Sequence, residues 1–273
     1  MSDEFVAAEA GTSPITITMN ASNSYQVTFS RPVSQPVRIA LPCENPSDYM
    51  AIQRRATGAF VGGLRNPVTG LREANITASD IYVVVENRQD FSDIQHLSQE
   101  TQRAIRILAA HGKVSGVGQG RFNPDSPINR AEIAALVTRM LGLGQNVSSS
   151  FRDVQRSDWF FGAVSSANQH GLMQGTGNNM FSPRTVLPRD QLTALAARVL
   201  RTQMGYRTPA YPDGFLRRFA DRDDLANWSI DDLALAAREN LIIRRADNRF
   251  LPRDPMTRGD AALVLYRLYN RLW

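Results

Sequence analysis

Three arginines occupy the same place in a repeated pattern, and they are the residues of this sequence best suited to bind an anion. Arg130, Arg189 and Arg258 each stand eight residues after the phenylalanine of a Phe-x-Pro element. A guanidinium group presents a planar fork of donors that matches a carboxylate or a phosphate. Each arginine lies in the first turn of a predicted helix, where a cation faces the positive end of the helix dipole at a cost of about 0.3–1 kcal/mol. The threefold recurrence of this unfavourable choice indicates an anion nearby.

Two kinds of partner for these arginines remain open at this point. One is internal: an aspartate that opens a repeat (Asp93, Asp153 or Asp221) or a neighbouring main-chain carbonyl. The other is an external anion, held where the helix amides, the dipole and the guanidinium converge. A second arginine follows nine residues after each of the first set, about 2.5 turns on, so it points to the opposite side of its helix, where we favour a structural role. These second arginines are Arg139, Arg198 and Arg267.

An internal repeat positions these arginines. Each repeat opens with Phe-x-Asp, runs through a first helical stretch, a loop and Phe-x-Pro, and ends in a second helix with an apolar stripe. We expect the first helices at about 98–110, 158–170 and 226–239. The stripes consist of Ile133, Leu136, Val137 and Met140; Leu192, Leu195, Ala196 and Val199; and Ala261, Val264, Leu265 and Leu268. Because each stripe needs a partner, we expect the second helices to form a central three-helix bundle about a pseudo-threefold axis.

The residues before each first arginine are typical of helix starts. Asn129 and Thr257 are good N-cap residues, and Glu132 stands at the capping-box distance from Asn129. Pro188 suits a first helical position, because it has no amide hydrogen to leave unpaired.

The part of the chain before about residue 88 predicts short strands instead of helices. The runs 15–19, 25–29, 37–41 and 81–85 are apolar and β-branched, with proline, asparagine and glycine clustered between them. Gly62-Gly63 and the segment 66–70 fit hairpin turns. This spacing favours a small β-sandwich. The predicted organisation is therefore α+β and multidomain, with a β-sandwich-like domain at 1–88 and helical repeats at 89–145, 146–206 and 207–273.

Composition excludes several classes of protein. The chain has 273 residues and a net charge of +5, and Lys113 and Cys43 are its only lysine and cysteine. A single cysteine excludes an internal disulfide and a thiolate metal cluster. No apolar window is long enough for a membrane span, and no recognition helix indicates a nucleic-acid partner. GC-rich coding is an alternative source of the arginine bias, so the positions of the arginines carry the argument, not their number.

The tryptophans and glycines of the repeats have both structural and functional interpretations. Trp159 and Trp228 begin the first helices of the second and third repeats, where a tryptophan anchors packing or, at the edge of a groove, stacks on a sugar ring. The glycines between the first helix and Phe-x-Pro are predicted to end the helix and turn the chain.

Together these motifs resemble the S-layer homology (SLH) domain family in its usual arrangement of three consecutive repeats, over about residues 91–273. The family's Thr-Arg-Ala-Glu signature stands here as Asn-Arg-Ala-Glu, Pro-Arg-Asp-Gln and Thr-Arg-Gly-Asp. The resemblance implies a three-pronged spindle that anchors bacterial surface proteins non-covalently to the cell wall. The ligand that it implies is an anionic secondary cell-wall polysaccharide, commonly with a pyruvate ketal on its terminal sugar.

The resemblance also implies which residues bind the glycan in the grooves between repeats. It gives recognition to the three signature arginines and a supporting role to the opening aspartates and two turn glycines, with the tryptophans at the groove edges. These residues are Arg130, Arg189, Arg258, Asp93, Asp153, Asp221, Gly116, Gly175, Trp159 and Trp228. The first repeat lacks its tryptophan, the second lacks the Ala and Glu of the signature, and the third lacks the turn glycines. We therefore expect unequal grooves, with the first and second better suited to bind.

The resulting hypothesis is a non-enzymatic anchoring module without a metal or a cofactor. We expect an acidic cell-wall polysaccharide and attached cargo domains as partners, at the cell surface or cell wall. We also expect the chain to be the C-terminal piece of a longer exported protein whose signal peptide lies outside this sequence. A self-associating surface-layer or scaffold protein, with contacts made by the β domain, is the alternative. A glycan-processing enzyme is disfavoured, since the sequence shows no nucleophile motif and no paired carboxylates that can be assigned to one cleft.

Overall fold

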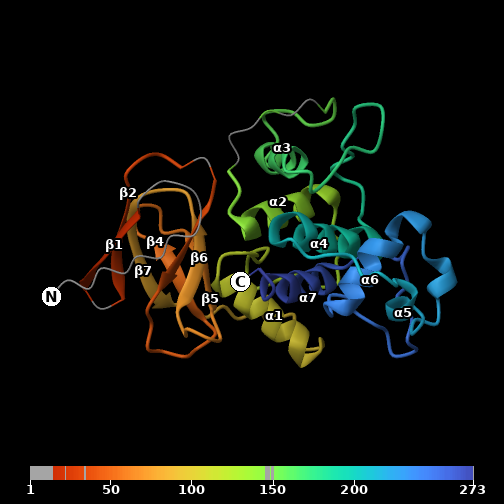
Figure 1. Ribbon diagram of the computed structural model, residues 1–273, viewed down its shortest axis with the longest axis horizontal. Coiled ribbons are helices and arrows are strands. Elements are labelled where there is room, and N and C mark those ends of the chain that lie inside the picture. Colours follow the sequence, from red (N-terminus) through yellow and green to blue (C-terminus); the bar gives the residue numbers. More distant parts are fainter. Residues whose placement is uncertain (1–14, 22, 34, 145–147, 149–150, 273) are drawn as a thin grey trace. The chain divides into compact units, whose positions relative to one another are not determined.

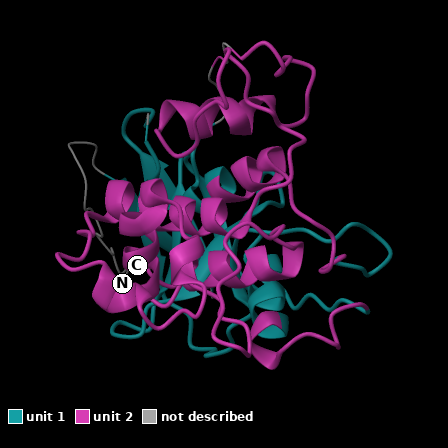
Figure 2. Ribbon diagram, turned by 90° about the vertical axis from the view of Figure 1, so that its right-hand side faces the viewer, with its two compact units in different colours: residues 1–92, 102–122, 138–144 teal, residues 93–101, 123–137, 145–273 magenta. Residues whose placement is uncertain are grey.

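The computed structural model describes residues 15–21, 23–33, 35–144, 148 and 151–272, which fall into two compact units (Figure 2). The first unit consists of residues up to 92 together with 102–122 and 138–144. The second consists of 93–101, 123–137 and the residues from 145 onward.

Seven antiparallel strands form one sheet in the first unit (Figure 1). The strands are β1 (Ile15–Ala21), β2 (Ser24–Phe29), β3 (Val37–Leu41), β4 (Met50–Arg54), β5 (Phe60–Arg65), β6 (Arg72–Ile76) and β7 (Asp80–Glu86), in the order β1-β2-β7-β4-β5-β6-β3. The predicted strands are confirmed as β1, β2, β3 and β7. The predicted sandwich is wrong, because the strands of the described residues form one sheet, not two. The sequence did not predict β4, β5 and β6, which fill the middle of the sheet, because β5 contains two glycines and β6 contains two charged residues.

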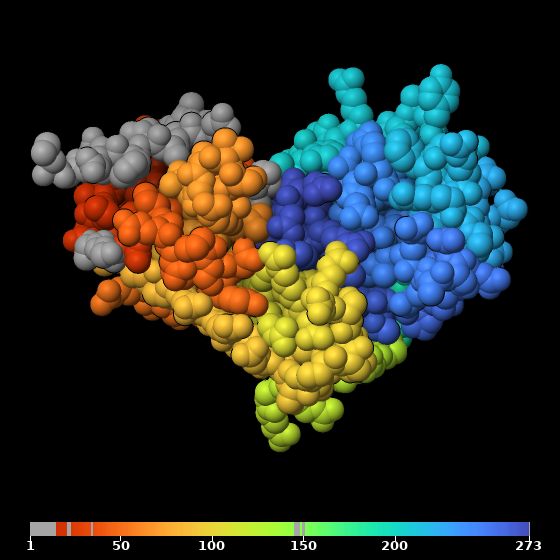
Figure 3. All heavy atoms as spheres, turned by 90° about the horizontal axis from the view of Figure 1, so that it is seen from below, coloured from red at the N-terminus to blue at the C-terminus, as the bar shows by residue number. Residues whose placement is uncertain are grey.

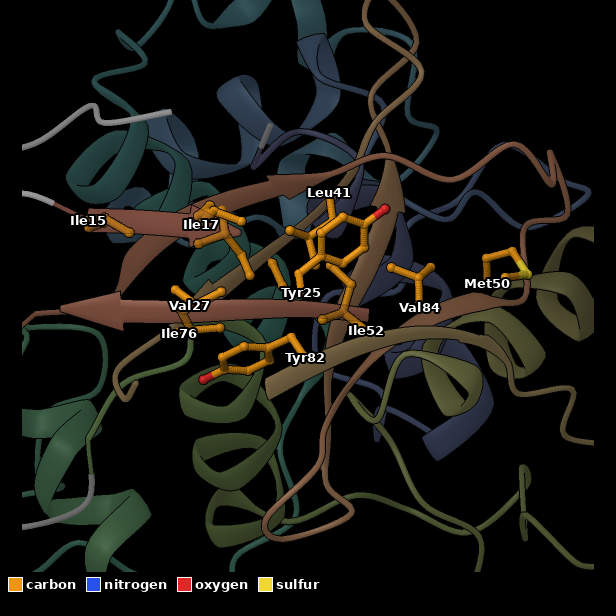
Figure 4. Close-up of a cluster of buried hydrophobic side chains, with 12 residues drawn as sticks. Ile15, Ile17, Tyr25, Val27, Leu41, Met50, Ile52, Ile76, Tyr82 and Val84 are labelled. Carbon is orange, nitrogen blue, oxygen red and sulfur yellow. The ribbon is translucent and has the colours of Figure 1, made fainter. Parts of the chain in front are cut away.

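The sheet curls into a half-barrel around a single apolar core. Ile15 and Ile17 of β1 and Ile39 and Leu41 of β3 belong to one buried cluster, although β1 and β3 are the two edges of the sheet. Figure 4 shows side chains of the edge strands in one cluster with side chains of the central strands, including Tyr82 of β7. Because the sheet is curved, its own edge strands cover the apolar core, which in a sandwich would be covered by a second sheet.

The two glycines of β5 lie inside the strand, so the predicted turn at this place is wrong. A Cβ atom on Gly63 would lie 2.4 Å from the carbonyl oxygen of Met50, and one on Gly62 would lie 2.8 Å from the Cβ of Ala74. The glycines therefore permit the close approach of the neighbouring strands β4 and β6. The predicted turn at 66–70 is confirmed, since the Gly70 amide donates to the Asn66 carbonyl at 2.9 Å between β5 and β6.

The helices follow the predicted repeat. The first helices are α1 (Gln99–Ala110), α3 (Phe161–Gln169) and α6 (Ile230–Arg238), and the second helices are α2 (Arg130–Leu141), α4 (Arg189–Met204) and α7 (Arg258–Tyr269). The third repeat adds α5 (Asp213–Leu216) and the 3-10 helices η1 (Arg222–Asp224) and η2 (Asn227–Ser229). All predicted stripe residues except Leu136 are buried, and α4 packs against α6 and α7. Within the described residues, no helix has the length and apolar character needed to cross a bilayer.

Capping explains where two of the second helices begin. The Glu132 amide donates to Asn129 Oδ1 and the Asn129 amide donates to Glu132 Oε2, both at 2.9 Å, which is a reciprocal capping box. Thr257 Oγ1 accepts from the Asp260 amide at 3.1 Å. Pro188 is itself the N-cap of α4, one residue before the predicted position.

The chain's only lysine is buried in the first unit. Lys113 Nζ donates to the Val61 carbonyl of β5 at 2.7 Å and lies 3.4 Å from the Arg139 carbonyl. Burial, assisted by the charge of Arg139, lowers the pKa of Lys113 to about 7. Burial likewise lowers the pKa of His111, whose Nε2 lies 3.1 Å from the Asp48 carbonyl, to about 3.

This buried amine predicts a pH-dependent stability. Above pH 7 the folded chain releases the proton of Lys113, whereas the unfolded chain keeps it up to the ordinary pKa of 10.5. The free energy of unfolding therefore rises with pH between these values, by up to about 1.36 kcal/mol per pH unit. Lys113→Met and Lys113→Gln should abolish this contribution, and urea unfolding at pH 7.5, 8.5 and 9.5 measures it. A difference between wild type and both variants that stays constant with pH would contradict the assignment.

Candidate functional site

The aspartate that opens each repeat holds the Phe-x-Pro element of the same repeat. Asp153 accepts from the amides of Phe181 and Ser182 at 2.8 and 2.7 Å. Asp221 accepts in the same way from Phe250 and Leu251, at 2.9 and 2.7 Å. In the first repeat, the Asn123 amide donates to Asp93 Oδ2 at 2.8 Å. The three predicted aspartates thus contact main-chain amides of their own repeat.

The middle residue of each Phe-x-Pro element adopts a left-handed conformation. Asn123, Ser182 and Leu251 have φ values of 60°, 57° and 58°. Such values are uncommon for residues other than glycine, and the carboxylate that receives the neighbouring amides holds the turn in this shape. The phenylalanines of the two motifs also pair in each repeat, with ring centroids 5.5, 5.4 and 6.2 Å apart.

Main-chain hydrogen bonds join the three repeats in a closed ring. The first two amides of each second helix donate to loop carbonyls of another repeat: α2 to the second repeat, α4 to the third, and α7 back to the first. The donor and acceptor pairs are Arg130–Thr185, Ala131–Pro183, Arg189–Asp254, Asp190–Pro252, Arg258–Ser126 and Gly259–Pro124, at 2.8–3.0 Å. Helix-start amides have no partner within their own helix. These amides are therefore already occupied, and the predicted external anion cannot bind to them without displacing a carbonyl.

A smaller ring of hydrogen bonds lies just before the helices. The Ile128 amide donates to Met256, the Met256 amide donates to Leu187, and the Leu187 amide donates to Ile128, each at 2.9 Å. Each repeat gives one hydrogen bond and receives one, so the ring has no free end.

The first arginines of the first two repeats reach into the next repeat. Arg130 donates from Nε to the Phe181 carbonyl at 2.8 Å and from Nη2 to the Gln174 carbonyl at 2.6 Å. Its Cζ lies 4.6 Å from the Phe181 ring centroid, within the range of a cation–π contact. Arg130 is 8% exposed, and burial lowers its pKa. Of the two kinds of partner that the sequence left open, Arg130 therefore has the internal one, namely main-chain carbonyls.

Arg189 repeats this arrangement and is fully buried. It donates from Nε to the Phe250 carbonyl at 2.8 Å, from Nη2 to the Ile243 carbonyl at 2.7 Å and from Nη1 to Asp260 at 2.6 Å. Arg258 is half-buried, with Nη1 3.7 Å from Glu132 Oε1.

A groove in the second unit brings together side chains from all three repeats, and we call it the Arg198 groove. The first repeat contributes Arg130, the second contributes the loop 172–176 and Arg198 of α4, and the third contributes Trp228. The groove has a volume of about 280 Å³, and Gln174, Thr176 and Gln191 add polar side chains to it. Two guanidinium groups line it, and none of its lining residues is acidic.

Arg130 and Arg198 line one groove because the two arginines of α4, Arg189 and Arg198, face opposite ways. Arg189, at the start of α4, points toward the third repeat, while Arg198 faces the loop of its own repeat and donates to the Leu172 carbonyl at 3.0 Å. Arg198 and Arg130, the first arginine of the preceding repeat, therefore line the same groove. The predicted orientation of Arg198 is correct, and a structural role was the one we favoured from the sequence. The nine-residue spacing between the two arginines of a helix was the signal available in the sequence. To infer from it which arginines share a groove, one also needs the order of the repeats around the ring.

A second groove, the Arg267 groove, follows the same plan one repeat further on. It is lined by the loop 240–246, Arg267 of α7 and residues 96–101 of the first repeat, and its volume is about 710 Å³. Arg189 donates to the Ile243 carbonyl in this loop, as Arg130 does to Gln174. This groove contains carboxylates, namely Glu100 and Asp260.

The other predicted site residues lie in less direct positions. A Cβ atom on Gly175 would lie 2.7 Å from the Phe151 ring, and one on Gly116 would lie 2.7 Å from the Phe91 ring, so both glycines permit close packing. Gly175 also lines the Arg198 groove. Trp159 is 67% exposed and packs edge-on against Phe160. Within the described residues, no group of three or more His, Cys, Asp or Glu side chains could hold a metal ion.

With this geometry established, comparison with known proteins identifies the family. Residues 90–134, 150–192 and 218–262 match the S-layer homology domain, so the chain belongs to the family of proteins that carry three such domains in a row. The family points to a location at the cell surface or cell wall.

Several curated proteins are similar to this chain. An amylopullulanase of Thermoanaerobacterium thermosulfurigenes is 25% identical over 94% of the chain, and Exoglucanase XynX of Acetivibrio thermocellus is 26% identical over 69%. The Surface-layer 125 kDa protein of Lysinibacillus sphaericus is 28% identical over 71%. The chain spans only 13%, 17% and 16% of the lengths of these relatives.

The aspartate contacts predict a large effect on stability. Asp221→Ala removes a charged acceptor from two amides, and we expect the free energy of unfolding to fall by about 2–4 kcal/mol. Urea unfolding measures this loss. Asp223→Ala, at a side chain that is 98% exposed, is the matched control and should change stability by less than about 0.5 kcal/mol. Equal effects of the two substitutions would show that the contacts of Asp221 contribute nothing.

Proposed function

We propose that the chain anchors a surface protein to the bacterial cell wall by binding an acidic cell-wall polysaccharide in the Arg198 groove. The observation that carries this proposal is that Arg130 and Arg198 line one groove with no acidic lining residue. Two cations brought together in a partly desolvated groove raise its affinity for an anion, and a guanidinium favours a carboxylate through its paired donors. A pyruvate ketal on a terminal sugar supplies such a carboxylate.

Arg198 is the cation of this groove that is best placed to meet a ligand. Its side chain is 29% exposed, and its nearest carboxylate, Asp232, lies 3.8 Å away, beyond hydrogen-bond distance. Asp232 pairs more closely with Arg201, at 2.7 Å. Arg130 adds positive charge behind the groove while its Nε and Nη2 atoms hold the loop. Among the residues predicted for the site, the proposal therefore rests on Arg130, Gly175 and Trp228.

Trp228 provides the apolar part of the recognition that we propose. It is 55% exposed at the groove edge. An exposed indole face stacks on the apolar face of a sugar ring, while Gln174, Thr176 and Gln191 can exchange hydrogen bonds with hydroxyl groups. The volume of about 280 Å³ lies near the lower end of the range for small-ligand sites and suits a terminal sugar better than a long chain segment.

The ring of main-chain hydrogen bonds supports the finer architecture that we propose: α2, α4 and α7 as a central bundle with pseudo-threefold symmetry. The relatives support the biological setting, because a surface-layer protein and polysaccharide-degrading enzymes of much greater length resemble this chain. We therefore propose that further domains of a longer protein are the cargo held at the wall.

Two substitutions test the groove while leaving the main-chain hydrogen bonds between repeats intact. Arg198→Ala and Trp228→Ala should each weaken binding of a synthetic 4,6-O-pyruvylated N-acetylhexosamine methyl glycoside at least tenfold, equivalent to about 1.4 kcal/mol. Isothermal titration calorimetry measures the dissociation constants. Arg249→Ala removes an exposed arginine that does not line the groove and should leave binding unchanged. Equal binding by wild type and both groove variants would refute this site.

The carboxylate requirement needs its own experiment. Purified chain should sediment with cell-wall sacculi, and extraction of the acidic polymer with hydrofluoric acid should abolish this binding. The same glycoside without its ketal should bind at least tenfold more weakly in calorimetry, because the guanidinium then has no carboxylate to pair with. Unchanged binding to stripped sacculi would favour another wall component as the partner.

A further inference from the structure

We propose that Glu100 closes the Arg267 groove to acidic ligands, because its carboxylate occupies the place that the carboxylate of a ligand would take. This inference rests on the proposed function, since it concerns which of two related grooves binds the glycan.

The Arg198 and Arg267 grooves have corresponding parts. Each has a second-helix arginine facing the loop of its own repeat, and the first arginine of the preceding repeat holds that loop from behind. The third repeat supplies both the loop 240–246 and α7 of the Arg267 groove, and their atoms lie in neighbouring shades of blue in Figure 3. The edge of the Arg198 groove is formed by Trp228, and the corresponding edge of the Arg267 groove is formed by the start of α1.

The two second-helix arginines differ in what they bind. Arg267 donates from Nε to Glu100 Oε1 at 2.9 Å and from Nη2 to Glu100 Oε2 at 2.8 Å. This parallel pair of hydrogen bonds is the arrangement that a guanidinium makes with a bound carboxylate. The Nη1 atom of Arg267 donates to the carbonyl of Ile242 at 2.9 Å, so all three guanidinium nitrogens are engaged. Arg198 has no such bidentate partner among the described residues.

The remaining charges of the Arg267 groove reinforce this difference. Asp260 accepts from Arg245 at 2.9 Å as well as from Arg189 at 2.6 Å. A ligand carboxylate entering this groove would meet two carboxylates of the protein and would have to displace one that is always present. Like charges at close distance oppose such binding.

Glu100 can be changed without breaking the fold, which makes the inference testable. Its side chain is 51% exposed, and exposed ion pairs contribute little to stability. Glu100→Gln keeps the size of the side chain and one acceptor but removes the charge that competes with a ligand. Asp223→Asn causes the same change of net charge at a side chain that is 98% exposed and lies outside both grooves.

The test counts binding sites for the pyruvylated glycoside by calorimetry in five proteins. We expect one site in wild type and in Asp223→Asn, and at most residual binding in Arg198→Ala. Glu100→Gln should show a second, weaker site, because the Arg267 groove has no tryptophan among its lining residues. The double variant Arg198→Ala/Glu100→Gln should keep this weaker site alone. Circular dichroism and thermal unfolding verify that each variant is folded. One site in Glu100→Gln, or two sites in wild type, would overturn this inference alone. No binding by wild type would instead overturn the proposed function.

Discussion

The structure of the repeats depends on the unpaired amides at the start of each second helix. An α-helix leaves its first amides without a partner, and here the first two in each of α2, α4 and α7 donate to loop carbonyls of another repeat. Those loops have the required shape because an aspartate of the same repeat receives the amides of its Phe-x-Pro element. Each repeat therefore completes another, and the ring closes because α7 donates back to the first repeat. A single repeat removed from the ring would leave both donors and acceptors unsatisfied.

This arrangement gives the two sets of arginines different positions and different partners. The first arginines of α2 and α4 lie at the helix starts, where the neighbouring loop is closest, so their guanidinium groups bind carbonyls of that loop. The second arginines of α4 and α7 donate to loop carbonyls of their own repeat, 2.5 turns along the helix. Each groove is therefore lined by the second arginine of one repeat and by the loop of that repeat. The first arginine of the preceding repeat donates to this loop and, in the Arg198 groove, also lines the groove itself. The positive charge that we propose for binding belongs to a pair of repeats.

Grooves built on one plan can still differ in chemistry, because residues outside the repeated motif line them. Trp228 stands at the edge of the Arg198 groove, whereas residues at the start of α1 border the Arg267 groove and bring Glu100 to Arg267. Asp260 replaces the Glu of the capping box in the third repeat and also binds Arg189 from the second. At this position of the cap, neutral Gln191 lines the Arg198 groove and charged Asp260 lines the Arg267 groove, so one residue changes the charge balance of a groove. We predicted unequal grooves from the missing motif residues, and the linings of the two grooves differ in their charges, because only the Arg267 groove contains Glu100 and Asp260.

The sequence by itself determined the repeat, its six principal helices, their buried stripes, the capping box at Asn129 and the family, because all of these depend on residues close together in the chain. It also determined four of the seven strands. Tertiary structure alone decided that the sheet is single and curved, since Gly62 and Gly63 are needed for contact with strands distant in sequence. It alone decided which partners the arginines have and which arginines share a groove. Spacing along a helix fixes the direction of a side chain, whereas its partner depends on where the next repeat lies.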